Sequence, residues 1–158
     1  MGRIVDGTGR GALTSSARRI HDPGARRVLL LIVGAAPRLR RHARALTAAT
    51  HATPGVKPKL GGPKADAKRL LQAIAGLHSD LHALRSNIKH VDCRTTAGRR
   101  GKADILKSLK TLDEELTTFS TAVTSQDSHV KGTATQRAMR LNKQAQAAAQ
   151  AGLALLQR

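Results

Sequence analysis

The chain has 158 residues, with 28 Lys plus Arg against 10 Asp plus Glu, a single Phe and no Tyr or Trp. Aromatic rings usually supply much of the buried area of a globular core, so this composition excludes a thick α/β core or a β-sandwich and leaves packing to Leu, Ile, Val and Ala. The net charge of +18 favours a polyanionic partner, because self-repulsion of this size destabilises a compact chain.

The first part of the chain, residues 1–64, carries 13 basic and only 2 acidic side chains. Asp22-Pro23-Gly24 has the composition of a turn, and residues 52–64 hold three prolines and three glycines with no apolar period, as expected for a linker. The sequence therefore predicts that residues 1–64 are a basic, largely disordered arm with a short apolar segment at 28–36 and a Pro/Gly linker at 52–64.

The apolar segment leaves the compartment open. Its nine residues are too few for a membrane-spanning helix, which needs about 20. They have the size of the hydrophobic region of a secretion signal, and residues 1–50 have the Arg-rich, acid-poor composition of a mitochondrial transit peptide. The lone Cys93 cannot form an internal disulfide, which favours an intracellular, reducing compartment. An intrinsic arm, mitochondrial targeting and export are therefore three alternatives.

Beyond the linker, apolar residues recur in steps of three and four. The first run is Ala67, Leu70, Ile74, Leu77, Leu81, Leu84, Ile88 and Val91. This strict heptad pattern predicts a helix over about 65–91.

Two more helices are expected after the break at residues 92–101, which contains Gly98 and Gly101. The pattern resumes with Ile105, Leu109, Leu112, Leu116, Phe119 and Val123, which predicts a helix over about 102–125. Residues 125–132 are polar, and we interpret them as a turn or as a hinge within a longer helix. A last helix over about 133–157 carries the mostly small seam Ala138, Leu141, Ala145, Ala148, Gly152 and Leu155.

The predicted fold is all-α. We expect residues 65–158 to form an antiparallel three-helix bundle or coiled-coil hairpin, preceded by the basic arm. The residues expected in the coiled-coil seam are Leu70, Ile74, Leu77, Leu81, Leu84, Ile88, Ile105, Leu109, Leu112, Leu116, Phe119, Val123 and Leu141.

The stretch LHSDLHALRSNIKHVDC, residues 77–93, has the composition of a metal site. However, the heptad pattern places its histidines off the seam and Asp80 on the other side of it, and Ser79 stands where a zincin motif needs Glu. We therefore predict no metal site. Antiparallel folding about the 92–101 loop instead predicts that Asp113, Glu114 and Glu115 pair with His78 and His82.

No enzyme is predicted. Cys93 follows Lys89 and precedes Arg94, and this positive surrounding favours a thiolate. A nucleophile also needs an oriented base, and none is evident, so we interpret Cys93 as a surface thiol. The glycine-rich stretches at 6–11 and 98–104 lack the spacing of phosphate-binding motifs. We expect no catalytic residue, no cofactor and no small-molecule substrate.

Binding to a nucleic-acid backbone, of RNA or DNA, is the predicted function, because phosphate contacts require only Arg and Lys and there is no aromatic platform for base stacking. The candidate polyanion-binding residues are Arg18, Arg19, Arg26, Arg27, Arg38, Arg40, Arg41, Arg44, Lys57, Lys59, Lys64, Arg85, Lys89, Arg94, Arg99, Arg100 and Lys102. The alternative is a structural coiled-coil subunit of a multiprotein assembly, similar in architecture to the helical-hairpin subunits of secretion filaments. It would join a protein partner or its own copies through apolar seams.

Overall fold

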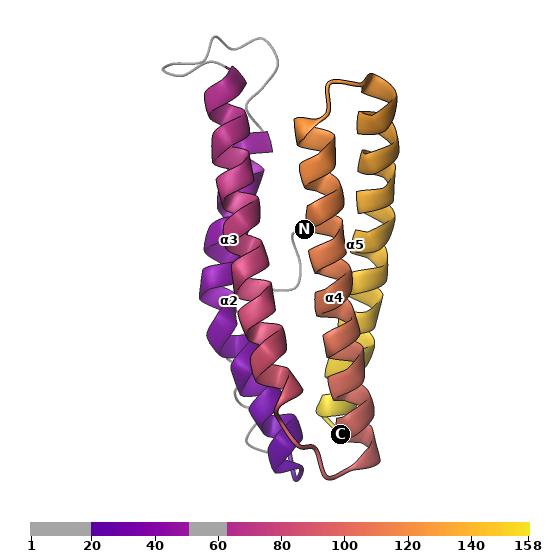
Figure 1. Cartoon of the computed structure of the whole chain (residues 1–158). Helices are drawn as coiled ribbons and strands as arrows, with labels where there is room; N and C mark the ends of the chain where they lie inside the picture. The colour runs from indigo at the N-terminus through magenta and orange to yellow at the C-terminus, as the bar shows by residue number, and fades with distance from the viewer. Residues whose placement is uncertain (1–19, 51–62) are drawn as a thin grey trace.

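The structure is a computed structural model of the whole chain and describes residues 20–50 and 63–158. This part of the chain is all-helical, with α2 (Pro23–Thr50), α3 (Pro63–Lys89), α4 (Thr96–Thr124) and α5 (Ser128–Leu156) and no strand. Successive helices run in opposite directions. They form two antiparallel hairpins, α2–α3 and α4–α5, which lie side by side with α3 next to α4 (Figure 1).

Helix α2 corrects the prediction that residues 1–64 form a flexible arm. Asp22 caps it by accepting hydrogen bonds from the backbone N–H groups of Gly24 at 2.9 Å and Ala25 at 3.2 Å, and Pro23 occupies the first helical position. Val28 and Leu29 of the apolar segment are fully buried in the core. For residues 1–19 and 51–62, which lie outside the described part, the arm and the linker stay predictions.

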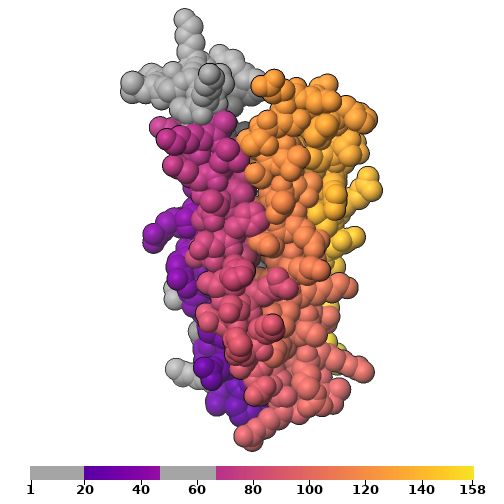
Figure 2. Space-filling view, in the orientation of Figure 1, coloured from indigo at the N-terminus to yellow at the C-terminus, as the bar shows by residue number. Residues whose placement is uncertain are grey.

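Helix α3 carries the first heptad seam and begins and ends two residues earlier than expected. Its apolar side is buried against its neighbours, and the exposed fraction of these side chains is below a tenth. The buried seam residues are Leu70, Ile74, Leu77, Leu81, Leu84 and Ile88. Figure 2 shows the atoms of α3 and α4 in contact along most of the length of the two helices.

Helix α4 begins six residues earlier than predicted, because Thr95 caps it and accepts a 2.9 Å hydrogen bond from the N–H of Gly98. Of its expected seam, Ile105, Leu109 and Leu116 are buried, and Leu112, Phe119 and Val123 are half-buried against the core. The turn to α5 spans only 125–127, because Asp127 caps α5 through the N–H groups of His129 and Val130.

Small residues bring α4 and α5 unusually close. A Cβ atom built on Gly101 would lie 2.9 Å from the carbonyl oxygen of Gly152, and one built on Gly152 would lie 2.9 Å from that of Gly101. Ala134, Ala138 and Ala145 continue the buried line on α5, and Leu141 beside them is half-buried. The alanine seam of the last helix is thus covered by α4 of the same chain.

Polar contacts are set into this close seam. The Ser108 hydroxyl donates a 2.8 Å hydrogen bond to the carbonyl oxygen of Ala145. The Asn142 amide donates to both carboxylate oxygens of buried Glu115, at 3.0 Å each. Burial raises the pKa of Glu115 above its usual value, and the hydrogen bonds from Asn142 offset only part of this effect.

Candidate nucleic-acid interface

One end of the molecule collects basic side chains from segments that are far apart in sequence. The start of α2 lies against the α3–α4 loop. The approach is so close that a Cβ atom built on Gly24 would clash with the backbone of Asp92. The carboxylate of Asp22 also accepts hydrogen bonds from the N–H and the hydroxyl of Thr95, both at 2.8 Å. Since α3 ends at this loop and α4 begins there, four elements meet at the lower end of Figure 1.

We call this surface the basic end and define it by seven exposed residues. They are Arg26, Arg27, Arg85, Lys89, Arg94, Arg99 and Arg100. All seven belong to the predicted polyanion-binding set. Helix α2 contributes the first pair, α3 the second, and the loop and the first turns of α4 the other three.

The charges of the basic end are not neutralised by ion pairs within the described residues. The four ion pairs among the described residues lie outside the basic end. Arg38 and His42 pair with Asp80, His78 pairs with Asp113, and Lys110 pairs with Glu114. Asp22 is buried and turned to Thr95, so the exposed carboxylate at this end is that of Asp92. Positive potential therefore reaches the solvent from this surface.

Asp22 is the residue that holds the basic end together. Burial raises the pKa of its carboxyl, but hydrogen bonds donated by Thr95 and by Ala25 and Arg94 outweigh burial and lower the pKa far below its usual value. From the sequence alone, Asp22 is expected only to be part of a turn. The signal that was missed is an Asp directly before a Pro, which is the pattern of a helix N-cap followed by the first helical residue.

Lys102 belongs to the structure of the loop rather than to an open binding surface. Its ammonium donates hydrogen bonds to the carbonyl oxygens of Lys89 at 2.8 Å and Val91 at 2.6 Å, and so caps the end of α3. Arg99 is partly committed as well, since its guanidinium donates to the carbonyl oxygen of Arg94 at 2.7 Å. Two of the three N–H donors of the Lys102 ammonium are thus engaged within the fold, and its contact with a polyanion stays a prediction.

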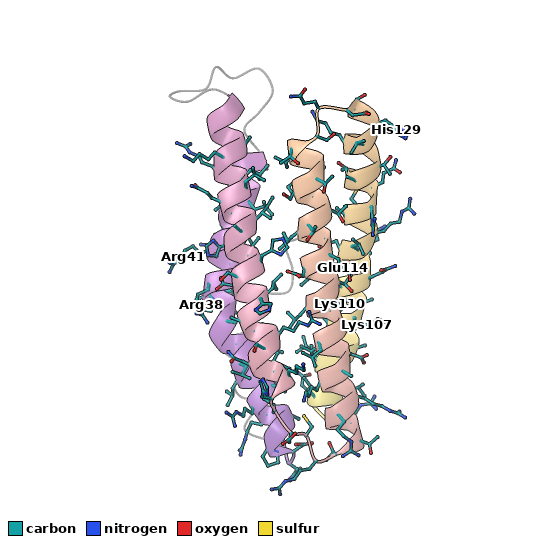
Figure 3. All side chains as sticks on the ribbon, viewed as in Figure 1. Arg38, Arg41, Lys107, Lys110, Glu114 and His129 are labelled. Carbon is teal, nitrogen blue, oxygen red and sulfur yellow. The ribbon has the colours of Figure 1, made fainter. Side chains whose placement is uncertain are left out.

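The other predicted residues lie elsewhere. Arg38 and Arg41 point outward from the middle of α2 in Figure 3, and Arg44 is exposed in the next turn. Arg38 is within 3.9 Å of Asp80, and Arg40 is half-buried. Outside the described residues fall Arg18, Arg19, Lys57, Lys59 and the side chain of Lys64.

Two basic residues near this end were missed by the sequence reasoning. Lys107 is exposed seven residues after Arg100 on α4, so it extends the basic end along the same helix face (Figure 3). Exposed Arg158 follows Leu156, which packs against Gly101. The seven-residue spacing was a readable signal for Lys107, whereas Arg158 required the position of α5.

The histidine-rich stretch 77–93 is divided between two helix interfaces. Asp80 faces α2, where its carboxylate oxygens lie 3.9 Å from Arg38 Nε and 3.6 Å from His42 Nε2. His78 faces α4 and shares a 2.5 Å hydrogen bond with Asp113. The predicted pairing is therefore found for His78, while His82 is exposed and has no ion pair in the described part of the chain. No group of three metal-ligating side chains occurs among the described residues.

Cys93 is buried, which corrects its interpretation as a surface thiol. Burial and the nearby charge of Asp22 raise the pKa of the thiol, and Lys102 offsets this only in part. The positive surroundings read from the sequence therefore do not produce a thiolate, because the basic side chains turn to solvent while the sulfur turns inward.

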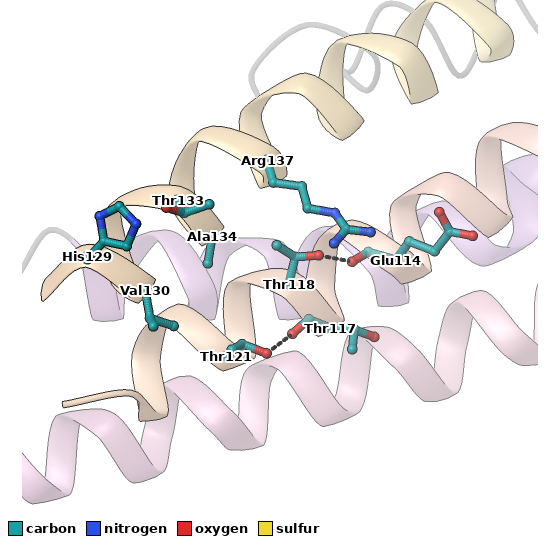
Figure 4. Close-up of a pocket in the computed structure, with 9 residues that line it drawn as sticks. All are labelled: Glu114, Thr117, Thr118, Thr121, His129, Val130, Thr133, Ala134 and Arg137. Atoms are coloured by element: carbon teal, nitrogen blue, oxygen red, sulfur yellow. Dashed lines mark hydrogen bonds between the residues drawn. The ribbon is translucent and has the colours of Figure 1, made fainter. Parts of the chain in front are cut away.

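A shallow groove of about 530 Å³ lies between α4 and α5 near their connecting turn. Figure 4 shows His129 and Glu114 toward opposite ends of it, with threonines between them. The Thr118 and Thr121 hydroxyls donate to the carbonyl oxygens of Glu114 and Thr117 in the preceding turn of α4. The hydrogen atoms of these two hydroxyl groups are thus engaged by the backbone of α4.

No helix in residues 20–50 and 63–158 combines the length and apolarity needed to cross a membrane. Comparison of the whole chain with protein-family models, curated proteins and solved structures gives no match.

Proposed function

We propose that this chain is a non-enzymatic, basic helical-bundle protein that binds the phosphate backbone of nucleic acid through its basic end. The observation that carries the proposal is the gathering of seven exposed Arg and Lys side chains from α2, α3, the α3–α4 loop and α4 at one end, away from the ion pairs. A sequence-independent phosphate backbone is the polyanion that such a surface fits best, because it requires cations and no base-reading groups.

The fold supports this role by holding the cations on rigid elements. Asp22 and Thr95 lock α2 to α4, and Lys102 locks α4 to the end of α3. Arginines displayed at fixed positions lose less conformational entropy on binding than those of a free chain. The carboxylates of Asp22, Asp80 and Glu115 are held in contacts within the fold, so they do not offset the charge of the basic end.

The test uses two triple variants that change the net charge equally. Arg27→Gln/Arg94→Gln/Arg100→Gln removes one cation from each of three segments of the basic end and avoids the side chains that hold the loop. Lys131→Gln/Arg140→Gln/Lys143→Gln removes three exposed cations from α5. Binding to a 20-base-pair duplex is followed by fluorescence anisotropy at several salt concentrations.

The first variant is expected to bind at least tenfold more weakly and to lose about 0.9 from the logarithmic salt slope for each phosphate contact removed. The α5 variant is expected to bind nearly as the parent does. Equal losses in the two variants would show that only net charge matters, and the proposal would then fail.

The structural-subunit alternative depends on apolar seams that one chain leaves uncovered. Helices α4 and α5 cover each other's seam within the chain, so the observation that favoured self-assembly is weakened. An assembly role stays a prediction, which a molar-mass measurement with and without nucleic acid tests. Truncation at residue 64 is unsuitable for such tests, because it removes the core residues Val28 and Leu29.

A further inference from the structure

Helix α2 has a second basic feature, separate from the basic end. A surface hollow of about 430 Å³ is lined by Ala36, Pro37, Arg40, Arg41 and Arg44. One water molecule needs only about 10–15 Å³ of such space, so a hydrated small anion fits. Residues 23–50 contain no Asp or Glu, so no carboxylate of α2 itself competes for these guanidinium groups.

Arg40 gives the hollow a specific feature. Its Nε atom is buried and has no hydrogen-bond partner among the described residues. A buried donor without an acceptor destabilises the fold, and more so when the group is charged. Arg41 and Arg44 flank it and are exposed, and neither takes part in an ion pair within the described part of the chain. Within residues 20–50 and 63–158, the hollow therefore offers three guanidinium groups and no described acceptor.

Among the α3 carboxylates whose side chains the structure describes, Asp80 is the one that faces α2, and it contacts other groups than those of the hollow. Asp80 turns to Arg38 and His42, which lie on the side of α2 that meets α3, and His42 packs its ring against Gly76. Asp80 is not among the residues that line the hollow. An external acceptor would thus meet the guanidinium groups without displacing an internal ion pair.

We propose that this hollow is a binding site for a single tetrahedral phosphate group, with Arg40 as the central donor and Arg41 and Arg44 as its flanking cations. The Arg40 side chain turns outward on binding, so that its Nε atom, which is closed to solvent and lacks an acceptor among the described residues of the unliganded fold, gains one. Arginine suits this ligand because its planar fork donates two parallel hydrogen bonds to phosphate oxygens. Small Ala36 and Pro37 leave room for the ligand beside the helix. The site goes beyond the proposed function, because it would take a free phosphate as well as a phosphodiester of a nucleic-acid backbone.

The experiment replaces arginine by lysine, which keeps the charge and removes the Nε donor and the fork. Arg40→Lys tests the central donor, and Arg44→Lys tests an exposed flanking residue if the first variant folds poorly. Arg140→Lys is the matched control, with the same chemical change at an exposed position of α5 that lies outside both the hollow and the basic end. Binding of inorganic phosphate is measured by calorimetry at constant ionic strength, with chloride as the balancing ion.

A second arm uses a short oligonucleotide without terminal phosphates, so that only phosphodiesters are present. We expect Arg40→Lys and Arg44→Lys to weaken phosphate binding at least tenfold and Arg140→Lys to leave it unchanged. Loss confined to the oligonucleotide arm would assign the site to phosphodiesters, and loss confined to inorganic phosphate would assign it to free phosphate.

If Arg40→Lys and Arg44→Lys bind both ligands as the parent does, the site does not exist. This result is distinguishable from failure of the proposed function, which is decided by the glutamine variants of the basic end.

Discussion

Alanine substitution at two glycines of α5 tests the close approach of α4 and α5. Gly152 faces α4, where a new Cβ would lie 2.9 Å from the carbonyl oxygen of Gly101, 3.0 Å from Ile105 Cγ1 and 3.1 Å from Asp104 Cβ. Gly132 lies in the same helix with nothing within 4 Å of its Cβ position. The same chemical change is therefore made once in contact with another helix and once in open space.

The magnitude follows from two opposing effects. Replacing Gly by Ala inside a helix stabilises by about 1 kcal/mol through helix propensity, and this gain applies at both positions. At Gly152 the carbonyl oxygen of Gly101 belongs to the backbone and cannot swing away, so the helices must separate by several tenths of an ångström. Overpacking of this kind destabilises by about 1–3 kcal/mol.

We therefore expect Gly132→Ala to be more stable than the parent by about 1 kcal/mol, and Gly152→Ala to be less stable than Gly132→Ala by about 1–3 kcal/mol. For a chain of this length, 1 kcal/mol corresponds to about 2–4 °C in Tm. Urea denaturation at pH 7, followed by circular dichroism, gives the two free energies of unfolding. If Gly152→Ala matches or exceeds Gly132→Ala in stability, the contact between Gly101 and Gly152 is not as close as described.

Three further substitutions test polar contacts of the fold. Asp22→Ala should lower the free energy of unfolding by about 2–4 kcal/mol at pH 7, because a helix cap is lost and the partly buried N–H and hydroxyl donors of Thr95 lose their acceptor. The pKa of Asp22 is lowered in the fold, so its contribution to the free energy of unfolding is present at neutral pH and is lost as the pH falls through and below the range where the unfolded carboxyl protonates. Asp22→Asn should therefore flatten the decline in stability at acidic pH, as measured by urea titrations at pH 2–5. An unchanged decline would contradict this role of Asp22. The raised pKa of Glu115 acts in the opposite sense, so the stability of the fold should fall as the pH rises from the usual pKa range of Glu through the raised pKa. Glu115→Gln should remove this fall. Thermal melts of variant and parent at pH 4–8 measure the difference. Lys102→Met should lower stability by about 1–3 kcal/mol through loss of charged hydrogen bonds to two carbonyl groups, while the salt slope of duplex binding stays at the parent value; a slope reduced by about 0.9 would instead place its ammonium on a phosphate.

The helices after residue 63 could be predicted from the heptad pattern, because apolar side chains at alternating steps of three and four fall on one face of an α-helix. The pattern places Leu81 and Ile88 in the core, where both are buried. It fails at helix boundaries, because a cap is a local hydrogen bond that apolar spacing does not encode. The sequence predicts a break in the helical pattern at Gly98 and Gly101, yet both lie inside α4. There the missing side chain lets α4 pack closely, at Gly98 against Asp22 and at Gly101 against α5.

Helix α2 was missed because its apolar run is short and arginines surround it. Burial of Val28 and Leu29 depends on the faces that α3 and α4 present, and this is a tertiary property. The basic residues of the candidate interface were read correctly as basic, but the sequence did not indicate which of them meet at one end. That grouping required the contact between Asp22 and Thr95, two residues 73 positions apart.

The shared use of the Asp22 carboxylate couples the local unfolding of two helix ends. One oxygen, Oδ1, receives the first amides of α2, and the other, Oδ2, receives Thr95, which itself caps α4. Fraying at the start of either helix therefore weakens the other, and the two ends are expected to open as one unit. Amide protons of Gly24, Ala25 and Thr95 should then exchange with solvent deuterium at a common opening free energy, although they belong to different hairpins.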